Sequence, residues 1–171
     1  AQPPLLFNEQ LKVFPKYDGI LCMLFHFNGH WKVSMGSGFA APVFPSTPNC
    51  AVTLSSVPIL IELFWKTWKD SEYQLPDPEE NMSYSFELCS TKCRKTVVYE
   101  EHQLVLIAVR DRNTMQEKSH EPIAEKYHWK YAKRLPVDSP SLPQIIKQAS
   151  TLSVLADEGF VLCDQNFNRM A

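Results

Sequence analysis

An apolar segment that ends in a tight-turn signal most constrains the fold of this chain. Residues 13–27 are dominated by apolar and aromatic side chains, and Asn28-Gly29 follows them directly. This dipeptide favours the two-residue turn that joins antiparallel strands. Residues 30–34 then alternate between polar and apolar side chains, as a returning strand does. The pattern therefore predicts a β-hairpin over Val13–Ser37.

The rest of the chain contains more predicted strands than helices. Strands are predicted from alternating side chains, and helices from apolar residues at helical spacing or from a proline near a first turn. The expected elements are a helix over Ser55–Trp68, a strand over Ser83–Cys89, a hairpin between Thr96–Tyr99 and Gln103–Arg110, a short helix over Leu142–Ser150 and a strand over Gly159–Cys163. Short turns between most strands indicate an α+β domain, with antiparallel sheets and flanking helices.

Composition narrows the class of protein. With 171 residues, 44% hydrophobic and 21% charged, the chain suffices for one globular domain with its own core. No apolar run is long enough and charge-free enough to span a bilayer. Five cysteines without a C-x-x-C pair favour reduced thiols in a cytoplasmic or nuclear protein. The net charge of −2 is lower than in most nucleic-acid-binding proteins, so RNA contacts would depend on local basic clusters.

Lys16-Tyr17-Asp18-Gly19 is the first motif with chemical potential, and it stands at the front of an apolar strand. One interpretation is a surface lysine followed by an Asp-Gly turn. The other follows from the apolar residues on both sides of the motif. A lysine flanked in this way can be partly desolvated at the floor of a pocket, where its amine can act as a nucleophile.

Two later carboxylates also stand in apolar strands. Glu87 lies within Tyr84–Leu88, where it either points to solvent on the polar face with Ser85 or is held in a site, because an unpartnered buried carboxylate is costly. Glu158 precedes Gly159 at the start of the last predicted strand. Taken alone, that pair favours a turn before an edge strand.

Together, the three motifs resemble the series K-x-D-G, F-E-L and E-G-[FY]-V of the covalent nucleotidyltransferases, which are the RNA and DNA ligases and the mRNA capping enzymes. They occur in this order, about 70 residues apart. The stretch from Phe86 to Asp111 resembles the phage-type RNA ligase 1 family, in which F-E-L runs into N-R-I-V, a tyrosine and an L-x-x-V-R-[DE] strand end. Ser34-Met35-Gly36-Ser37 resembles the S-K-G-S element of that family. The resemblance covers Phe14 to Ala171 and implies a nucleotidyltransferase (ATP-grasp-like ligase) domain.

The resemblance also implies an ATP-dependent RNA ligase. Its cofactors would be ATP and Mg²⁺, and its substrate RNA with 5′-phosphate and 3′-hydroxyl ends, in RNA repair or tRNA splicing. The implied roles are those of a nucleophile that forms lysine–AMP (Lys16), a turn that presents it (Asp18 and Gly19), nucleotide contacts (Ser34 and Gly36), a ribose contact (Glu87), a metal ligand (Glu158) and an adenine contact (Val161).

Three departures from the family pattern bear on this expectation. Met35 stands where the family has a lysine, and Lys32 is the nearest replacement. Only 15 residues precede Lys16, and the closing K-x-K element of the family would fall just beyond Ala171. We therefore interpret residues 1–171 as an adenylyltransferase domain that is truncated at both ends.

Two basic clusters are candidates for contact with RNA. Residues 126–134 read KYHWKYAKR, in which cations alternate with aromatic residues, and a second cluster lies at residues 92–95. Cations can meet phosphates and aromatic rings can stack on bases, whereas the alternative is a solvated surface segment with its aromatic rings packed inward. The predicted RNA contacts are Arg94, Lys95, Lys130, Lys133 and Arg134. The acidic loop at residues 70–80 is expected to lie away from RNA.

Other functions remain open at this stage. A tRNA-splicing ligase of the fungal type has a distantly similar adenylyltransferase domain. A capping guanylyltransferase fits less well, because the Arg94–Asp111 region follows the ligase pattern. A degenerate ligase-like domain that only binds RNA or a protein partner is favoured by Met35 and opposed by the intact Lys16, Glu87 and Glu158.

Overall fold

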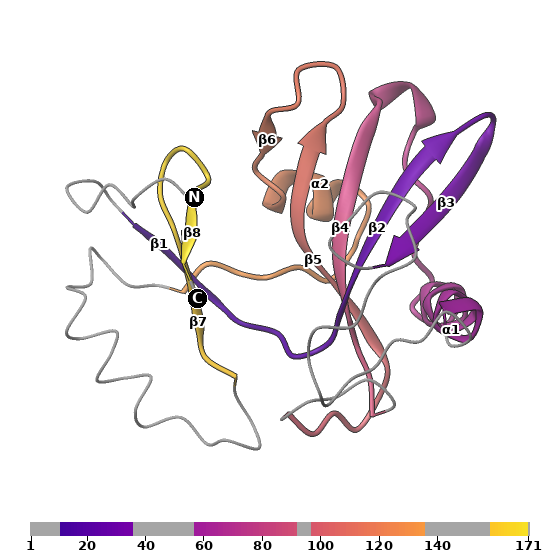
Figure 1. The fold of residues 1–171 in the computed structure, drawn as a ribbon, viewed down its shortest axis with the longest axis horizontal. Coiled ribbons are helices and arrows are strands. Elements are labelled where there is room, and N and C mark those ends of the chain that lie inside the picture. The colour runs from indigo at the N-terminus through magenta and orange to yellow at the C-terminus, as the bar shows by residue number, and fades with distance from the viewer. Residues whose placement is uncertain (1–10, 36–56, 92–96, 136–157, 171) are drawn as a thin grey trace. The chain divides into compact units, whose positions relative to one another are not determined.

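The computed structural model describes residues 11–35, 57–91, 97–135 and 158–170. The chain forms two compact units, which we call the small unit (residues 1–18, 96–98 and 132–171) and the large unit (residues 19–95 and 99–131). Their elements (Figure 1) are β1 (Lys12–Pro15), β2 (Ile20–Phe27), β3 (His30–Met35), α1 (Val57–Asp70), the 3-10 helix η1 (Pro78–Glu80), β4 (Met82–Cys89), β5 (Gln103–Asp111), β6 (Glu117–Lys118), α2 (Glu121–Lys126), β7 (Phe160–Cys163) and β8 (Arg169–Met170).

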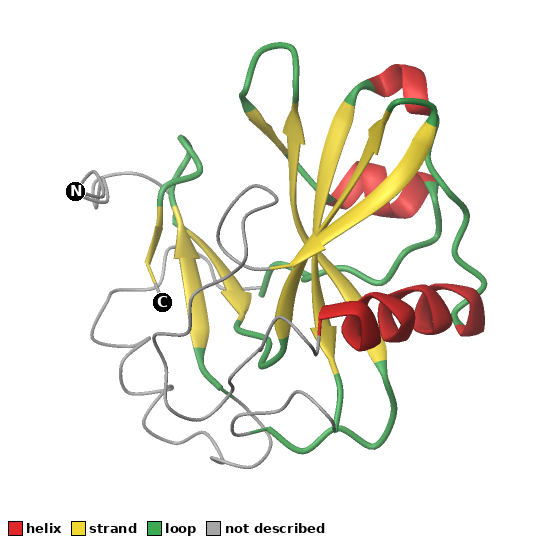
Figure 2. Cartoon of the chain, turned by 45° about the vertical axis from the view of Figure 1, so that its right-hand side comes forward, coloured by secondary structure: helices red, strands yellow, loops and turns green. Residues whose placement is uncertain are grey.

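The large unit is built on a five-stranded antiparallel sheet in the order β3-β2-β4-β5-β6. Alternate residues of its strands point into one hydrophobic core, because successive side chains of a strand lie on opposite faces. Helices α1 and α2 pack on this core face (Figure 2). The fully buried sheet residues include Cys22, Leu24, Tyr84, Phe86, Leu88, Leu104, Leu106 and Val109. No helix among the described residues is long and apolar enough to cross a membrane.

The first hairpin is shorter than the sequence predicts. Strands β2 and β3 pair around Asn28 and Gly29, whose φ angles of 50° and 76° are those of the turn that this dipeptide favours. The expectation of one hairpin over Val13–Ser37 is wrong for its first residues, because β1 pairs with β7 in another sheet. The apolar character continues through both strands, so composition does not reveal that the chain changes sheets between Pro15 and Ile20.

The other predicted elements have mixed outcomes. Strands β4 and β7 and helix α1 confirm the expected strands and the first helix, although residues 55 and 56 lie outside the described residues. The expected second hairpin is wrong, because β5 pairs with β4 and β6 and residues 97–99 form no strand. The backbone N–H of Val97 instead donates to Asp18. The short helix predicted over residues 142–150 lies outside the described residues.

The small unit contains a three-stranded antiparallel sheet in the order β1-β7-β8. Its core consists of Leu11, Val13 and Leu162, with Leu135 and Phe160 packed against them. The backbone N–H of Leu135 donates to the carbonyl of Val13, 2.8 Å away. Residues that are distant in the sequence therefore hold β1 on both of its sides.

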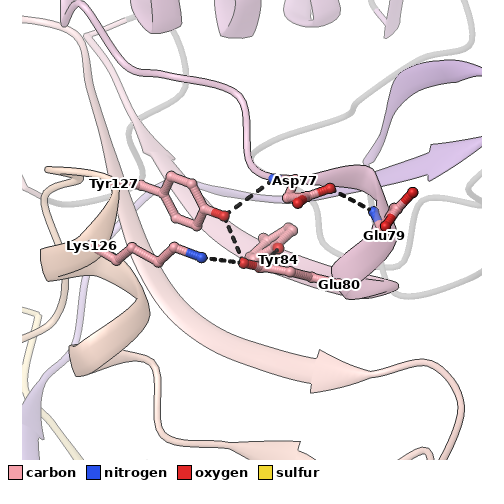
Figure 3. A network of polar contacts seen from close by, with 6 residues as sticks. All are labelled: Asp77, Glu79, Glu80, Tyr84, Lys126 and Tyr127. Atoms are coloured by element: carbon pink, nitrogen blue, oxygen red, sulfur yellow. Dashed lines mark hydrogen bonds and ion pairs between the residues drawn. The ribbon is translucent and has the colours of Figure 1, made fainter.

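A polar network in the large unit joins η1 to β4 and to the end of α2 (Figure 3). The Glu80 carboxylate accepts hydrogen bonds from Lys126 Nζ at 2.5 Å, Tyr127 Oη at 2.7 Å and the buried Tyr84 Oη at 3.0 Å. Tyr127 Oη in turn accepts from the backbone N–H of Asp77 at 3.1 Å. One carboxylate thus accepts hydrogen bonds from two tyrosines and a lysine at the place where η1, β4 and the end of α2 meet.

This network predicts a pH-dependent contribution to stability. Burial by itself raises the pKa of the Glu80 carboxyl, but the hydrogen bonds from Lys126, Tyr127 and Tyr84 outweigh it and hold that pKa below its ordinary value. The ionised carboxylate therefore contributes stability above its unfolded pKa of about 4.3, and that stability is lost as the pH falls through the lower folded pKa.

We expect Glu80→Gln to lower the free energy of unfolding by about 1–2 kcal/mol at neutral pH. The difference from wild type should close below about pH 4. Urea unfolding across this pH range would measure it. The exposed neighbour Glu79 offers a matched control, since Glu79→Gln should change stability little at any pH; an equal effect of both variants would contradict the assignment.

Candidate functional site

Lys16 is the first residue after β1, and pairing between β1 and β7 positions it. Its backbone N–H donates to the carbonyl of Gly159 at 2.9 Å, which extends the ladder by one residue. Its Nζ forms an ion pair with the Glu158 carboxylate, although 142 residues separate them. The side chains are 36% and 21% exposed. The first and third motifs of the sequence thus form one half-exposed site in the small unit.

Val161 shares this region of the small sheet. It lies directly opposite Phe14, two residues along β7 from Gly159, with which Lys16 pairs. Opposite residues in an antiparallel ladder project from the same face. Phe14, Val161 and Lys16 therefore occupy neighbouring positions on one face, an arrangement that can place an apolar surface next to the amine. The adenine contact expected of Val161 stays a prediction.

Asp18 is buried, with 2% of its surface exposed. Its Oδ2 accepts a hydrogen bond from the backbone N–H of Val97 at 2.7 Å. A buried carboxylate needs such donors, and this contact ties the segment after Lys16 to a distant part of the chain. The geometry fits a residue that shapes the turn behind the lysine.

The space around position 19 explains why the first motif ends in glycine. A Cβ at this position would lie 2.4 Å from the carbonyl oxygen of Leu88 and 3.1 Å from Cγ of Glu87. Real Cβ atoms do not approach backbone atoms so closely, so any side chain would displace the end of β4. Gly19, the last residue of the first motif, therefore packs directly against the end of β4 within the large unit.

The substitution Gly19→Ala should consequently disturb both stability and the position of Glu87. We expect a loss of about 1–3 kcal/mol in the free energy of unfolding, as for other overpacked sites, and weaker binding of the nucleotide that the sequence predicts Glu87 to contact. Urea unfolding and titration with ATP would measure the two effects.

Gly29→Ala is the matched control for this prediction. Gly29 has a φ of 76° and no atoms within 4 Å of an added Cβ, so its substitution costs about 1–2 kcal/mol of backbone strain without moving β4. ATP affinity should fall in Gly19→Ala alone. Wild-type stability in Gly19→Ala would disprove the steric argument.

Glu87 lies on the face of the large sheet opposite to the hydrophobic core. Its neighbours Phe86 and Leu88 are fully buried in that core, whereas Glu87 is half-buried beside Leu21 and Val105. Ser85 shares this second face, and Ser34 joins it through the row Ser34, Met23 and Ser85. The predicted nucleotide contacts Glu87 and Ser34 thus belong to the same sheet face.

Met35 is buried in the hydrophobic core of the large unit, where it pairs with Cys22. It follows Ser34 in the strand and so projects from the opposite face. Met35, which stands where the phage-type RNA ligase 1 family has a lysine, therefore cannot contact a phosphate on the face of Ser34. Lys32 does share that face, with its Nζ 5.1 Å from the centre of the Phe27 ring.

The basic-aromatic run at residues 126–134 has its two central rings packed inward. Tyr127 and Trp129 are buried in the core, and Trp129 Nε1 donates to the carbonyl of Gln74 at 3.0 Å. Stacking of these two rings on RNA bases is excluded by their burial. The inward packing that the alternative interpretation predicts is therefore confirmed for these two rings.

The predicted RNA-contacting cations of this run are exposed. They are Lys130, whose Nζ donates to Gln103, together with Lys133 and Arg134. Gly36, Arg94 and Lys95 lie outside the described residues. A role in RNA binding stays a prediction for all of these cations.

Glu158 is the residue that the sequence predicts as a ligand of a divalent metal. Among the described residues, no group of three or more histidines, cysteines or carboxylates could hold a metal ion. Mg²⁺ bound with nucleotide phosphates needs only one or two protein carboxylates, because phosphate oxygens and water complete its shell. A half-exposed carboxylate beside the amine fits that mode of binding.

The fold is mixed α and β with antiparallel sheets and few helices, and it matches the nucleotidyltransferase fold of RNA ligases. No protein-family model and no curated protein sequence matches the chain. Among solved structures, it is similar to the RNA ligase of Naegleria gruberi.

A lysine-to-alanine variant of that ligase with ATP and manganese has a TM-score of 0.63 at 12% identity, over 94% of this chain and 48% of that chain. The complex of the ligase with pyrophosphate has a TM-score of 0.62 at 12% identity, over 94% and 48%. A glutamate-to-alanine variant with AMP and manganese has a TM-score of 0.59 at 12% identity, over 92% and 47%. The chain thus spans about half the length of these ligases.

Proposed function

We propose that this chain is the adenylyltransferase domain of an ATP-dependent RNA ligase of the phage RNA ligase 1 type. The observation that carries the proposal is the ion pair between Lys16 and Glu158. Strand pairing joins two residues from opposite ends of the motif series, on a fold that matches RNA ligases. A primary amine can act as the nucleophile of a covalent nucleotidyl transfer, and a carboxylate next to it can hold a divalent metal.

In the proposed first step, Lys16 Nζ attacks the α-phosphorus of ATP. A nitrogen–phosphorus bond forms, the bond to pyrophosphate breaks, and the amine gives up a proton. The ion pair must separate before this attack, because a protonated ammonium has no electron pair to donate. Phosphoryl transfer depends mainly on positioning and charge neutralisation. A divalent metal supplies part of that neutralisation, and Glu158 would hold it.

In the proposed later steps, an RNA 5′-phosphate takes the AMP from Lys16, and the nitrogen–phosphorus bond breaks. The RNA 3′-hydroxyl then attacks the activated 5′-phosphate, forms a phosphodiester and releases AMP. We assign Glu87 to the ribose of ATP, Val161 to adenine, and Ser34 to the nucleotide, with Mg²⁺ as the metal. RNA repair or tRNA splicing would be the setting for this reaction.

The experiment that tests the proposal is covalent labelling of the chain by α-labelled ATP in the presence of Mg²⁺. We expect an acid-labile label that excess ATP competes away and that labelled GTP does not produce. Met35, buried where the family has a lysine, favours one second candidate: a ligase-like domain that binds RNA or a protein without catalysis. Absence of label both on this chain and on a chain extended at both ends, with RNA still bound, would favour that candidate instead.

A further inference from the structure

The second face of the large sheet changes character along its strands. Near one end it carries Glu87 and Ser85. Towards the β2–β3 turn it carries a row in which Lys32 lies opposite Phe25, Phe25 opposite Ser83, and Ser83 opposite Arg110. Because opposite residues share a face, this row crosses four strands on the same face as Glu87.

Cations and aromatic rings are interleaved at this row. Arg112 Cζ lies 6.0 Å from the centre of the Phe25 ring, and its Nη1 donates to the carbonyl of His26 at 2.7 Å. Lys32 Nζ lies 5.1 Å from the centre of the Phe27 ring, which is 48% exposed. We call Phe25, Phe27, Lys32, Arg110 and Arg112 the basic strip.

The charge of the basic strip is positive. Among the described residues of the sheet, Glu117 lies directly opposite Arg110 on β6. Glu87 shares the face but lies four residues along β4 from Ser83, which is opposite Arg110. Asp111 points to the other face, where it accepts hydrogen bonds from the backbone of Asn113 and Thr114 and pairs with Lys118 at 3.9 Å. Lys32, Arg110 and Phe27 are exposed, so the basic strip can meet a ligand without rearrangement of the core.

We propose that the basic strip binds single-stranded RNA. Exposed cations would contact its phosphates, and the Phe27 and Phe25 rings would stack on its bases, as on other surfaces that bind single strands. An acidic peptide would need only the cations, whereas every nucleotide also offers a flat aromatic surface to the rings. The inference deepens the proposed function, on which it rests for the choice of RNA as ligand. It places the strand on the sheet face that carries Glu87.

The test measures binding of a fluorescent, 5′-phosphorylated single-stranded RNA by anisotropy, without ATP, at several salt concentrations. Each phosphate contact contributes about 0.7 to the slope of log affinity against log salt. Lys32→Ala combined with Arg110→Ala should therefore lower that slope by about 1.4. Phe27→Ala should weaken binding about tenfold with little change in slope.

The matched control removes two exposed lysines from α1, on the core face of the sheet. Lys66→Ala combined with Lys69→Ala changes the net charge equally and should keep the wild-type affinity and slope. Circular dichroism would verify that all variants are folded. Wild-type affinity in the strip variants, equal weakening by the control, or tighter binding of poly-glutamate than of RNA would overturn the proposal. Because binding is measured without ATP, its failure is distinguishable from a failure of lysine–AMP formation.

Discussion

Replacement of Lys16 with alanine is expected to abolish covalent labelling of the chain by α-labelled ATP. The proposed intermediate is a bond between Lys16 Nζ and the α-phosphorus, and alanine has no atom that can form it. Lys16→Arg should be equally inactive, although an arginine can still pair with Glu158. A guanidinium stays protonated in proteins and is not a nucleophile. This second variant separates loss of the nucleophile from loss of the ion pair.

Lys12→Ala provides the matched control for this experiment. Lys12 is the first residue of β1, the strand that leads to Lys16, and its Nζ lies 5.8 Å from the centre of the Phe167 ring. Its loss should leave labelling intact. Glu158→Gln should weaken labelling strongly without removing the nucleophile. The same measurements on a chain extended at both ends would show whether flanking residues are needed. Retained label in Lys16→Ala would disprove the assignment of the nucleophile.

The largest effect on stability is expected from Trp129→Ala. Trp129 is 3% exposed, and its ring lies 5.3–5.5 Å, between ring centroids, from those of Trp68, Tyr84 and Phe86. Removal of such a side chain from a packed core costs about 3–5 kcal/mol. That is a large share of the roughly 5–15 kcal/mol that stabilises a typical domain. Urea unfolding should show the loss as a lower midpoint.

Lys130→Ala, one residue further along, is the control for Trp129→Ala. Lys130 is exposed, so we expect a change within about 0.5 kcal/mol. Trp129→Phe should keep most of the ring contacts and lose only the hydrogen bond to Gln74. If Trp129→Ala weakened RNA binding and left the free energy of unfolding unchanged, the assignment of this ring to the core would be contradicted.

Local sequence patterns predicted most strands but not their partners. The alternation of residues 83–89 and the Asn28-Gly29 turn identified β4 and the β2–β3 hairpin, because both signals act between near neighbours. Their apolar character predicts residues 13–15 as part of that hairpin, yet these residues pair with β7. The sequence likewise predicts that β5 pairs with residues 96–99, but β5 pairs with β4 and β6. Partner choice depends on contacts between residues that are distant in the sequence, which periodicity does not encode.

The candidate site shows the same division. Resemblance to the nucleotidyltransferase motif series selected Lys16, Glu87 and Glu158. Nothing in the sequence around Lys16 or Glu158 indicated that these two residues form an ion pair. The basic strip was also missed, although alternation along β2 and β3 puts Phe25, Phe27 and Lys32 on one face. Only the register of the sheet shows that Arg110 joins them.

The sequence by itself therefore determined the short-range turns and strands, and its resemblance to a known motif series indicated candidate residues for chemistry. Position 19 needs a glycine because β4 passes too close for a side chain. Met35 and Trp129 cannot contact a nucleotide or RNA because both side chains are packed in the core. These outcomes were decided by the tertiary structure. The physical reason is that a side chain's environment is set by the face and the strand partner that it receives. In a sheet, both are fixed by pairing between distant segments.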